Sequence, residues 1–552
     1  MRMPLILLAL SLGLVPSALA QTAPAEPAFS ADEVRAHVSF LADDLLEGRN
    51  AGTRGYEVAA RYVATRFAAL GLKPGGTDGG WYQSVPLAQY SLDDSKPASM
   101  TLGGKTFANG ADVLISASPR YGNETQLLNG DAVFVGHGLE SDYAGLDVRG
   151  KFVVTLIGLP KGMTAEQGNA AGGTDKPAIA GKHGALGVLY MVSPENLTGT
   201  FPWLQAVTYF SRPQTNWLSP TGAPAGEDPG IKIGAYINPV AATALFAGAP
   251  MSAEQVFAAA ALPGAVKGFA LAQRVTTQRT SKIASMTSPN VIGLLPGSDP
   301  GLAAEYVVLS AHLDHDGVDP KLTGDQIYNG AMDNAAGVAT MLEAARAFQQ
   351  SGKKPKRSIL FVALTAEEDG LLGSDYLAHY PVVGTGKVVA DVNLDMPILL
   401  YDFQDVVAFG AEHSTLGPIV EAAAAKMGVT LSPDPMPEEQ LFIRSDHYSF
   451  VKQGVPSVFL VTGFKNGGEK AFRDFLTTNY HKVSDQVSLP FDWEAGAKFA
   501  RINYLIAREI ADAPQAPRWY EGNMYGDRYA KDAPKAPKPA AAPAAPAPKP
   551  AG

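Results

Sequence analysis

Three short apolar runs, interleaved with helical patterns, constrain the fold of this chain more than any other feature. They begin the stretches 305–317 (EYVVLSAHLDHDG), 357–370 (RSILFVALTAEEDG) and 388–396 (VVADVNLDM), and each is rich in β-branched side chains. Between the first two, residues 338–348 repeat apolar side chains at helical spacing. Buried strands that alternate with helices are typical of parallel sheets. The sequence therefore predicts an α/β fold with a mixed, mostly parallel central sheet flanked by helices.

Acidic and histidine side chains stand where these apolar runs stop. In chain order they are His312, Asp314, His315, Asp316, Asp333, Glu367, Glu368, Asp369 and Asp395, and the motif NYHKVSD (479–485) adds His481. Ligands of parallel sheets bind beyond the carboxyl ends of the strands, so we expect these side chains to converge at one edge. A single His or Asp at a strand end is more often structural, but five pieces in this order predict a metal site. The chain has no cysteine, and imidazole with carboxylate favours zinc, with cobalt or manganese as possible substitutes.

The ordered set resembles the co-catalytic di-zinc aminopeptidase family, the secreted bacterial leucine-type aminopeptidases of the MH clan of metallopeptidases. The resemblance covers most of the chain outside its two ends, and it implies the zinc exopeptidase fold with two zinc ions per chain. It also implies a role for each residue: one zinc site with His312 and Asp395, the other with Glu368 and His481, Asp333 as the bridge, and Glu367 as general base. From the residues themselves either Glu367 or Glu368 could be the base, and only the resemblance orders them.

Two further carboxylates are predicted to orient the histidines. Asp314 lies two residues after His312, where it would accept the other ring N–H of that histidine and fix its tautomer. Asp485 would support His481 in the same way. Two neighbours in the first motif are not predicted to be ligands, namely His315 and Asp316.

Four more residues are candidates for contact with a substrate. Tyr480 would donate its hydroxyl to a developing oxyanion, with a packing role as the alternative. The motif RSDHYSF (444–450) resembles a second family signature. It predicts Arg444, Asp446 and His447 around the substrate pocket, with a purely structural loop as the alternative.

The chain of 552 residues is too long for one compact core, so several domains are expected. We predict a signal peptide (1–20), an N-terminal part of the catalytic domain (21–95), an inserted β-rich domain (96–281), the main catalytic part (282–515) and a disordered Pro/Ala/Lys-rich tail (516–552). The insert carries YAGLDVRGKFVV and AGKHGALGVLY, which resemble the protease-associated domain. Because it offers no catalytic cluster, we expect it to limit access or to bind larger substrates. The motif LLEGRNAGTRG (45–55) resembles an N-terminal family signature and is expected to cover the sheet.

The first twenty residues have the pattern of a secretory signal. Arg2 precedes an apolar run at residues 5–15, and Ala18-Leu19-Ala20 forms a small-x-small cleavage site. This run is shorter than the roughly 20 apolar residues that a membrane span needs. We therefore expect a periplasmic or secreted protein without a membrane anchor. The net charge of −10 argues against a nucleic-acid partner.

Three classes of function fit this pattern: a zinc exopeptidase acting on peptides, a glutaminyl-cyclase-like acyltransferase, and a non-catalytic receptor-like binding protein. The cyclases compared use a single zinc and the receptors have lost ligands, whereas all ligands for two ions are present here. An aminopeptidase holds a substrate ammonium with carboxylates, while a carboxypeptidase grips a carboxylate with arginine. Around these motifs carboxylates abound and Arg444 is the one obvious arginine. The sequence therefore favours an aminopeptidase, with a carboxypeptidase as the alternative.

Overall fold

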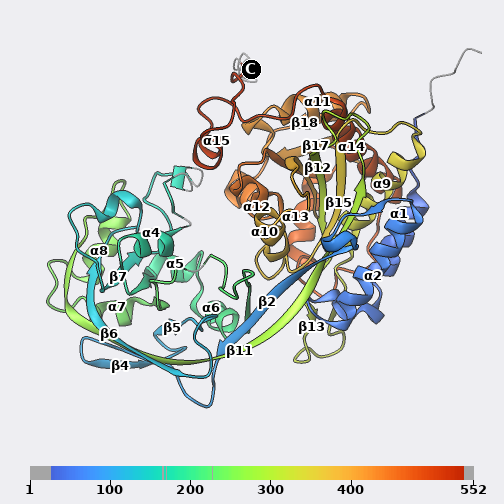
Figure 1. Cartoon of the computed structure of the whole chain (residues 1–552). Coiled ribbons are helices and arrows are strands. Elements are labelled where there is room, and N and C mark those ends of the chain that lie inside the picture. Colours follow the sequence, from blue (N-terminus) through green and yellow to red (C-terminus); the bar gives the residue numbers. More distant parts are fainter. Residues whose placement is uncertain (1–25, 165–166, 169–170, 174, 227, 540–552) are drawn as a thin grey trace, which may run out of the picture.

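The computed structural model describes residues 26–164, 167–168, 171–173, 175–226 and 228–539 of the chain. These residues form two bodies joined by a long two-stranded arm (Figure 1). The predicted signal peptide lies outside the described residues. Within the described part, no helix combines the length and the apolar character needed to cross a membrane.

The first body is built on a sheet in which the three predicted apolar runs are neighbouring strands. In the order in which they pair, its strands are β11 (Phe269–Leu295), β15 (Ser358–Leu364), β12 (Glu305–His312), β16 (Lys387–Leu394), β19 (Ser457–Thr462), β17 (Asp405–Phe409) and β18 (Thr430–Ser432). Strands β15, β12, β16 and β19 are parallel to one another, whereas β11 runs antiparallel to β15 and β17 runs antiparallel to β19. Strand β18 is parallel to β17. On its other side β11 pairs with β1 (Lys73–Pro74) and β2 (Tyr82–Leu92). The predicted mixed, mostly parallel sheet is confirmed.

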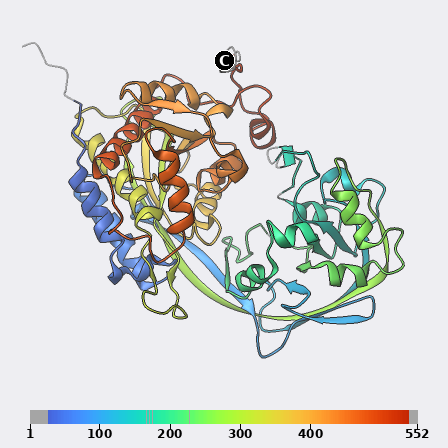
Figure 2. The same ribbon diagram turned by 180° about the vertical axis from the view of Figure 1, so that it is seen from behind.

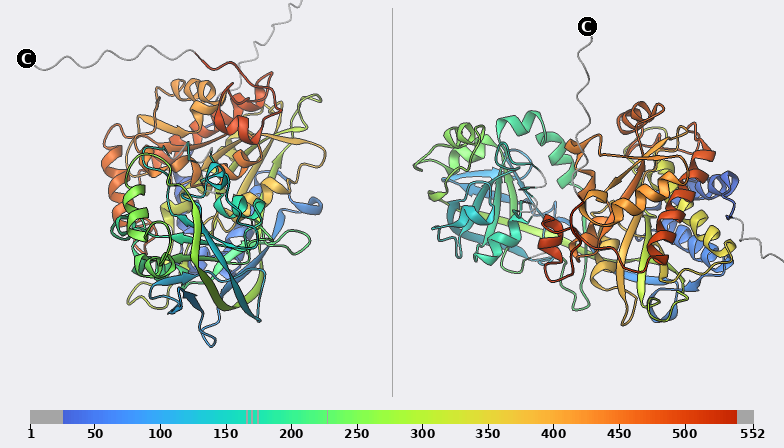
Figure 3. Two further views of the ribbon diagram at one scale, coloured as in Figure 1. Left: turned by 90° about the vertical axis from the view of Figure 1, so that its left-hand side faces the viewer. Right: turned by 90° about the horizontal axis from the view of Figure 1, so that it is seen from above.

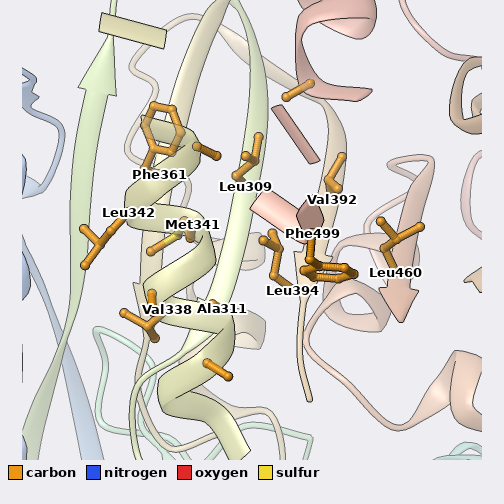
Figure 4. Close-up of a cluster of buried hydrophobic side chains, with 14 of the residues drawn as sticks. Leu309, Ala311, Val338, Met341, Leu342, Phe361, Val392, Leu394, Leu460 and Phe499 are labelled. Carbon is orange, nitrogen blue, oxygen red and sulfur yellow. The ribbon is translucent and has the colours of Figure 1, made fainter. Parts of the chain in front are cut away.

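Helices cover both faces of this sheet, because the side chains of its central strands alternate between two apolar cores. In β12, Val307 and Leu309 belong to the larger core, whereas Val308 belongs to a smaller core. Helices that contribute to the larger core are α1 (Ala31–Leu41), α2 (Arg54–Ala69), α9 (Ala336–Gln350), α11 (Leu416–Ala425), α13 (Gly468–Thr478) and α14 (Trp493–Asp512). The smaller core receives side chains from α10 (Leu372–His379) and α12 (His447–Lys452). Figure 4 shows part of the larger core, with Met341 of α9 and Phe499 of α14 among strand side chains.

The second body has its own sheet and its own cores. In pairing order its strands are β4 (Lys105–Ala108), β3 (Ser99–Leu102), the first part of β11, β6 (Thr125–Phe134), β7 (Phe152–Leu156), β8 (Gly187–Met191), β10 (Gly234–Ile237) and β5 (Val113–Ile115). Its described helices are α4 (Lys176–Lys182), α5 (Pro194–Thr198), α6 (Trp203–Phe210), α7 (Pro239–Leu245) and α8 (Ala253–Ala260). Four parallel strands, from β6 to β10, form its centre, and α4, α7 and α8 add side chains to its cores. The described part of the insert thus combines a many-stranded sheet of its own with short helices, and its likeness to the protease-associated domain remains a prediction.

A single long strand, β11, joins the two bodies (Figure 2). It pairs with β6 up to Thr280 and with β2 from Ser281 onward, so it passes from one sheet into the other within one strand. Strand β9 (Gln214–Trp217) belongs to the insert by sequence but pairs with β2 in the sheet of the first body. The insert thus touches the first body through the arm and through β9.

The C-terminal segment differs from its prediction. Residues 516–539 do not form an extended tail: they contain helix α15 (Met524–Tyr529), and Trp519 is 2% exposed. The indole of Trp519 donates to the carbonyl of Gly454 across 2.8 Å, and its ring packs in a cluster with Tyr525. Seen from above, α15 lies between the two bodies, where Arg528 pairs with Asp175 of the insert (Figure 3). Aromatic side chains in this segment supply the apolar surface that the Ala, Pro and Lys residues further on cannot. Residues 540–552 lie outside the described part.

Candidate metal centre

The structure brings all five predicted metal ligands together. His312 is the last residue of β12, Glu368 follows β15, and Asp395 follows β16, so three of them occupy the carboxyl ends of adjacent parallel strands. Asp333 lies in the short helical turn Ala331–Ala335 that leads into α9, and His481 lies in the loop after α13. The predicted convergence at one edge of the sheet is what the structure has.

The carboxylate of Asp333 stands between two histidine–carboxylate pairs. Its Oδ1 is 3.2 Å from Nε2 of His312, and its Oδ2 is 3.4 Å from Nε2 of His481. His312 Nε2 is also 3.1 Å from Oδ1 of Asp395, and His481 Nε2 is 3.2 Å from Oε2 of Glu368. Each oxygen of Asp333 therefore faces a separate pair, as a carboxylate that bridges two cations must.

The chemistry of this donor set suits a divalent metal such as zinc. Three carboxylates and two imidazoles meet here, and ligand atoms of His312, Asp333 and Glu368 lie within 4.8 Å of one another. Burial alone would lower the pKa of His312, but Asp395, Glu367 and Asp333 together raise it well above its usual value. Buried carboxylates in such number require compensating positive charge, which a bound divalent metal would supply.

Asp314 and Asp485 support the centre differently from the prediction. The carboxylate of Asp314 accepts the backbone N–H groups of Glu367 (3.1 Å) and Glu368 (3.2 Å), while its backbone carbonyl faces Nδ1 of His312 at 3.2 Å. The carboxylate of Asp485 accepts the backbone N–H of Asp333 at 3.0 Å and does not orient His481. Burial raises the pKa of both carboxyls to about 6. Both carboxylates therefore hold backbone far along the chain and do not face the histidines that they were predicted to orient.

His315 and Asp316 take the orienting positions instead. Nδ1 of the buried His315 is 2.6 Å from Oε1 of Glu368, and Oδ2 of Asp316 is 3.7 Å from Nδ1 of His481. Ligand atoms of Asp316, Glu368 and His481 also lie within 4.8 Å of one another. The residues directly after His312 therefore supply the partners of the second histidine–carboxylate pair.

Glu367 differs from Glu368 in where its side chain goes. Glu367 lines a cavity of about 230 Å³ beside the metal centre, together with His312, Asp333 and Asp395. Glu368 instead faces His481 and His315. Burial raises the pKa of Glu367 well above its usual value, and the neighbouring Glu368 and Asp395 raise it further while His312 opposes them. A carboxylate at the cavity wall beside the metal ligands can accept a proton from a water there.

The rest of the cavity wall is mainly apolar. Its side chains that are neither metal ligands nor Glu367 are Met396, Glu439, Leu441, Arg444, Ser445, Phe459, Val461, Phe472, Leu476 and Tyr480. The wall can therefore enclose an apolar side chain next to the ligand set.

Comparison with known proteins agrees with this geometry. Residues 290–507 match the family model of Peptidase family M28. This part of the chain is an M28 peptidase domain. The probable leucine aminopeptidase 2 of Aspergillus oryzae is 27% identical over 231 residues, which cover 38% of this chain and 42% of that protein. The leupeptin-inactivating enzyme 1 of Streptomyces exfoliatus is 28% identical over 199 residues, 34% of this chain and 39% of that enzyme.

A solved structure, the aminopeptidase from Aneurinibacillus sp. strain AM-1, is 19% identical with a TM-score of 0.49, and the match covers 88% of this chain and 95% of that one. In contrast, the chain spans less than half the length of the two curated relatives, the leucine aminopeptidase and the leupeptin-inactivating enzyme. The family match agrees with the resemblance seen in the motifs of the M28 domain.

The substrate-contacting residues predicted for the M28 domain divide into two groups. Tyr480 lines the cavity and its ring lies 4.0 Å from that of His481 between centroids. Arg444 also lines the cavity, where it pairs with Glu439 at 3.2 Å. Asp446 and His447, in contrast, are fully buried.

The buried pair supports the cavity from behind and does not face a substrate. The ring of His447 packs 5.5 Å from that of Phe459, which lines the cavity, and burial lowers the pKa of this histidine to about 3. The prediction that Asp446 and His447 contact the substrate is therefore corrected.

Three residues that support the metal centre were not predicted. Ser445 donates its hydroxyl to Oδ2 of Asp395 at 2.7 Å, in the motif that had been assigned to the substrate pocket. Asn334 donates to the carbonyl of Leu394 at 3.0 Å, which ties the start of α9 to the end of β16. Arg49, only 1% exposed, donates to the carbonyls of Leu313 and Gly330 and so joins the segments that carry His312 and Asp333. Arg49 lies in the glycine-rich N-terminal motif (45–55), but nothing local in the sequence shows that its partners are main-chain carbonyls of the metal centre.

Proposed function

We propose that this protein is a zinc-dependent aminopeptidase that removes N-terminal residues from peptides and acts outside the cytoplasm after loss of its signal peptide. The observation that carries the proposal is the Asp333 carboxylate, whose two oxygens each face a separate histidine–carboxylate pair. Such a carboxylate is required to hold two cations close together, and two-metal sites recur in aminopeptidases.

Two zinc ions per chain fit this arrangement, with cobalt or manganese as substitutes. His312 and Asp395 would hold one ion, Glu368 and His481 the other, and Asp333 both. When bound, such a pair lowers the pKa of a water and polarises the carbonyl of the scissile bond. Asp314 and Asp485 keep the ligands in place by holding the backbone of Glu368 and Asp333.

Glu367 is the general base in this proposal. From the cavity wall it accepts a proton from the attacking water, and it then returns that proton to the nitrogen of the departing amine as the C–N bond breaks. The hydroxyl of Tyr480, whose pKa burial raises, stays protonated and can donate a hydrogen bond to the oxygen of the tetrahedral intermediate.

The cavity wall favours a peptide with a free N-terminus and an apolar first residue. Glu367 and Asp395 place carboxylates where a substrate ammonium would enter. A carboxypeptidase would need an arginine for the substrate carboxylate, but Arg444 is already paired with Glu439. The apolar wall would surround a leucine-like side chain.

Metal analysis combined with a pair of matched peptides tests the proposal. The purified protein should contain about two zinc ions per chain, a strong chelator should abolish activity, and zinc or cobalt should restore it. Asp333→Asn should lower the zinc content, whereas Asp474→Asn, on the exposed surface of α13, should leave it unchanged. A leucine-initiated peptide should be cleaved and its N-acetylated form should not. Full activity without metal, or cleavage of the acetylated peptide from its C-terminal end, would contradict the proposal.

A further inference from the structure

Strand β9 joins the insert to the sheet of the first body. It pairs with β2 from Leu87 opposite Trp217 to Tyr90 opposite Gln214, although the rest of the insert builds a different sheet. Helix α6, directly before it in sequence, lies beside the arm formed by β2 and β11 (Figure 1). Four residues of the insert are thus part of the sheet that bears the metal centre.

Trp217, at the end of β9, packs near the segment that carries Glu367. The side chain is 5% exposed and shares an apolar cluster with Ala366 and Leu372. Its indole N–H donates to Oδ2 of Asp375 on α10 at 2.9 Å. Ala366 immediately precedes Glu367, and α10 begins at Leu372, so residues at both ends of the intervening loop belong to the same apolar cluster as the indole.

This loop, residues 365–371, is named here the base turn. It has positive φ angles at two residues that are not glycine, +52° at Ala366 and +61° at Leu371. Residues with a Cβ disfavour this region, so the conformation persists only where surrounding structure holds it. Asp314 holds the middle of the base turn through the backbone N–H groups of Glu367 and Glu368. The apolar cluster around Trp217 covers Ala366.

We propose that β9 is a positioning element for the catalytic base, with Trp217 as the positioning residue. The insert then contributes to turnover at the metal centre. From its sequence it was expected only to limit access or to bind larger substrates. This inference rests on the proposed function, because it takes Glu367 as the base. Without the indole, Ala366 loses its cover and the base turn can relax, which moves Glu367. A displacement of about 1 Å at a reacting group can cost about 100-fold in rate.

The test compares Trp217→Ala and Trp217→Phe with a matched control, Tyr209→Ala. Tyr209 is an aromatic residue of the same insert, 59% exposed on α6. All proteins are assayed with leucine p-nitroanilide in excess zinc, after circular dichroism shows that they are folded. Trp217→Ala should lower kcat about tenfold or more with KM within about twofold. Trp217→Phe, which keeps an aromatic ring but lacks the indole N–H, should show a smaller loss, and Tyr209→Ala should show none.

Amide hydrogen exchange supplies a readout that does not depend on activity. Residues 365–373 should exchange faster in Trp217→Ala and, to a lesser degree, in Trp217→Phe, but not in Tyr209→Ala. If the alanine variant does not fold, the phenylalanine variant decides the question by both measurements. Unchanged kcat and exchange in the folded Trp217 variants, or a rise in KM alone, would overturn the inference. A wild-type protein without peptidase activity would instead refute the proposed function, and the exchange measurement alone would then show whether β9 holds the base turn.

Discussion

Asp314→Asn is the perturbation that most directly tests how the base turn is held from within the M28 domain. The Asp314 carboxylate accepts two backbone N–H groups, at 3.1 Å from Glu367 and 3.2 Å from Glu368. A hydrogen bond to a charged acceptor contributes about 1.5–3 kcal/mol. Asparagine keeps one acceptor oxygen and turns an NH₂ group toward the other backbone N–H, so one bond is lost. We expect the native turn to lose about 2–3 kcal/mol relative to displaced conformations.

That loss converts to a decrease in kcat of about 30–150-fold, since each 1.36 kcal/mol is a factor of ten. Steady-state kinetics with excess zinc measures it. The backbone carbonyl of Asp314, which faces Nδ1 of His312 at 3.2 Å, is unchanged in the variant, so the pair of His312 and Asp395 should still bind metal. The control is Asp319→Asn: Asp319 also accepts a backbone N–H, from Lys321 at 2.9 Å, but away from the centre. A kcat within twofold of wild type in Asp314→Asn, or an equal loss in the control, would refute the reasoning.

Three further predictions concern the proposed general base, the hydrogen-bond partner of a proposed metal ligand, and one buried histidine. Glu367→Gln should keep zinc and lose about 10²–10⁴-fold in kcat, whereas Glu368→Gln should lose zinc by elemental analysis; reversed phenotypes would exchange the two roles. Ser445→Ala removes the 2.7 Å hydrogen bond to Asp395 and should weaken zinc about 10–100-fold in chelator competition; unchanged affinity would show that the bond does not matter. Burial, with nearby arginines, lowers the pKa of His37 to about 4 from its ordinary value of about 6.5. Between these two pH values the unfolded chain binds a proton that the folded chain does not bind. The free energy of unfolding should therefore fall by about 3 kcal/mol as the pH drops from 6.5 to 4. Urea denaturation should show this share missing in His37→Gln, and an identical pH dependence would contradict it.

The convergence of the proposed metal ligands could be predicted from sequence, because the sheet itself places them. His312, Glu368 and Asp395 each follow a strand whose apolar run is visible in the sequence, and parallel strands bring their carboxyl ends to one edge. The mixed sheet followed from the same runs. Period and composition, both local properties, were sufficient for this part of the fold.

The supporting contacts could not be predicted, because they join residues far apart in the chain. Asp314 was expected to face His312, two residues away, but its carboxylate reaches backbone 53 and 54 residues away. A spacing of two gives a shared face only while the strand continues, and β12 ends at His312. The C-terminal segment was misjudged for a related reason. The composition of its last residues outweighed a few aromatic ones, among them Trp519, that find partners only in the folded body.

Residues at the ends of strands and residues of the base turn are held in place by different interactions, and only the former could be predicted. A ligand at the end of a strand inherits its position from the ladder of hydrogen bonds behind it. Glu367 has no such ladder, and it lies between Ala366 and Leu371, two residues with positive φ at a cost of about 1–3 kcal/mol each. Its position must be over-determined from outside: Asp314 holds the backbone of the turn, and Trp217 shares an apolar cluster with Ala366. One support comes from the M28 domain and the other from the insert, so the proposed catalytic base depends on a junction that neither sheet contains alone.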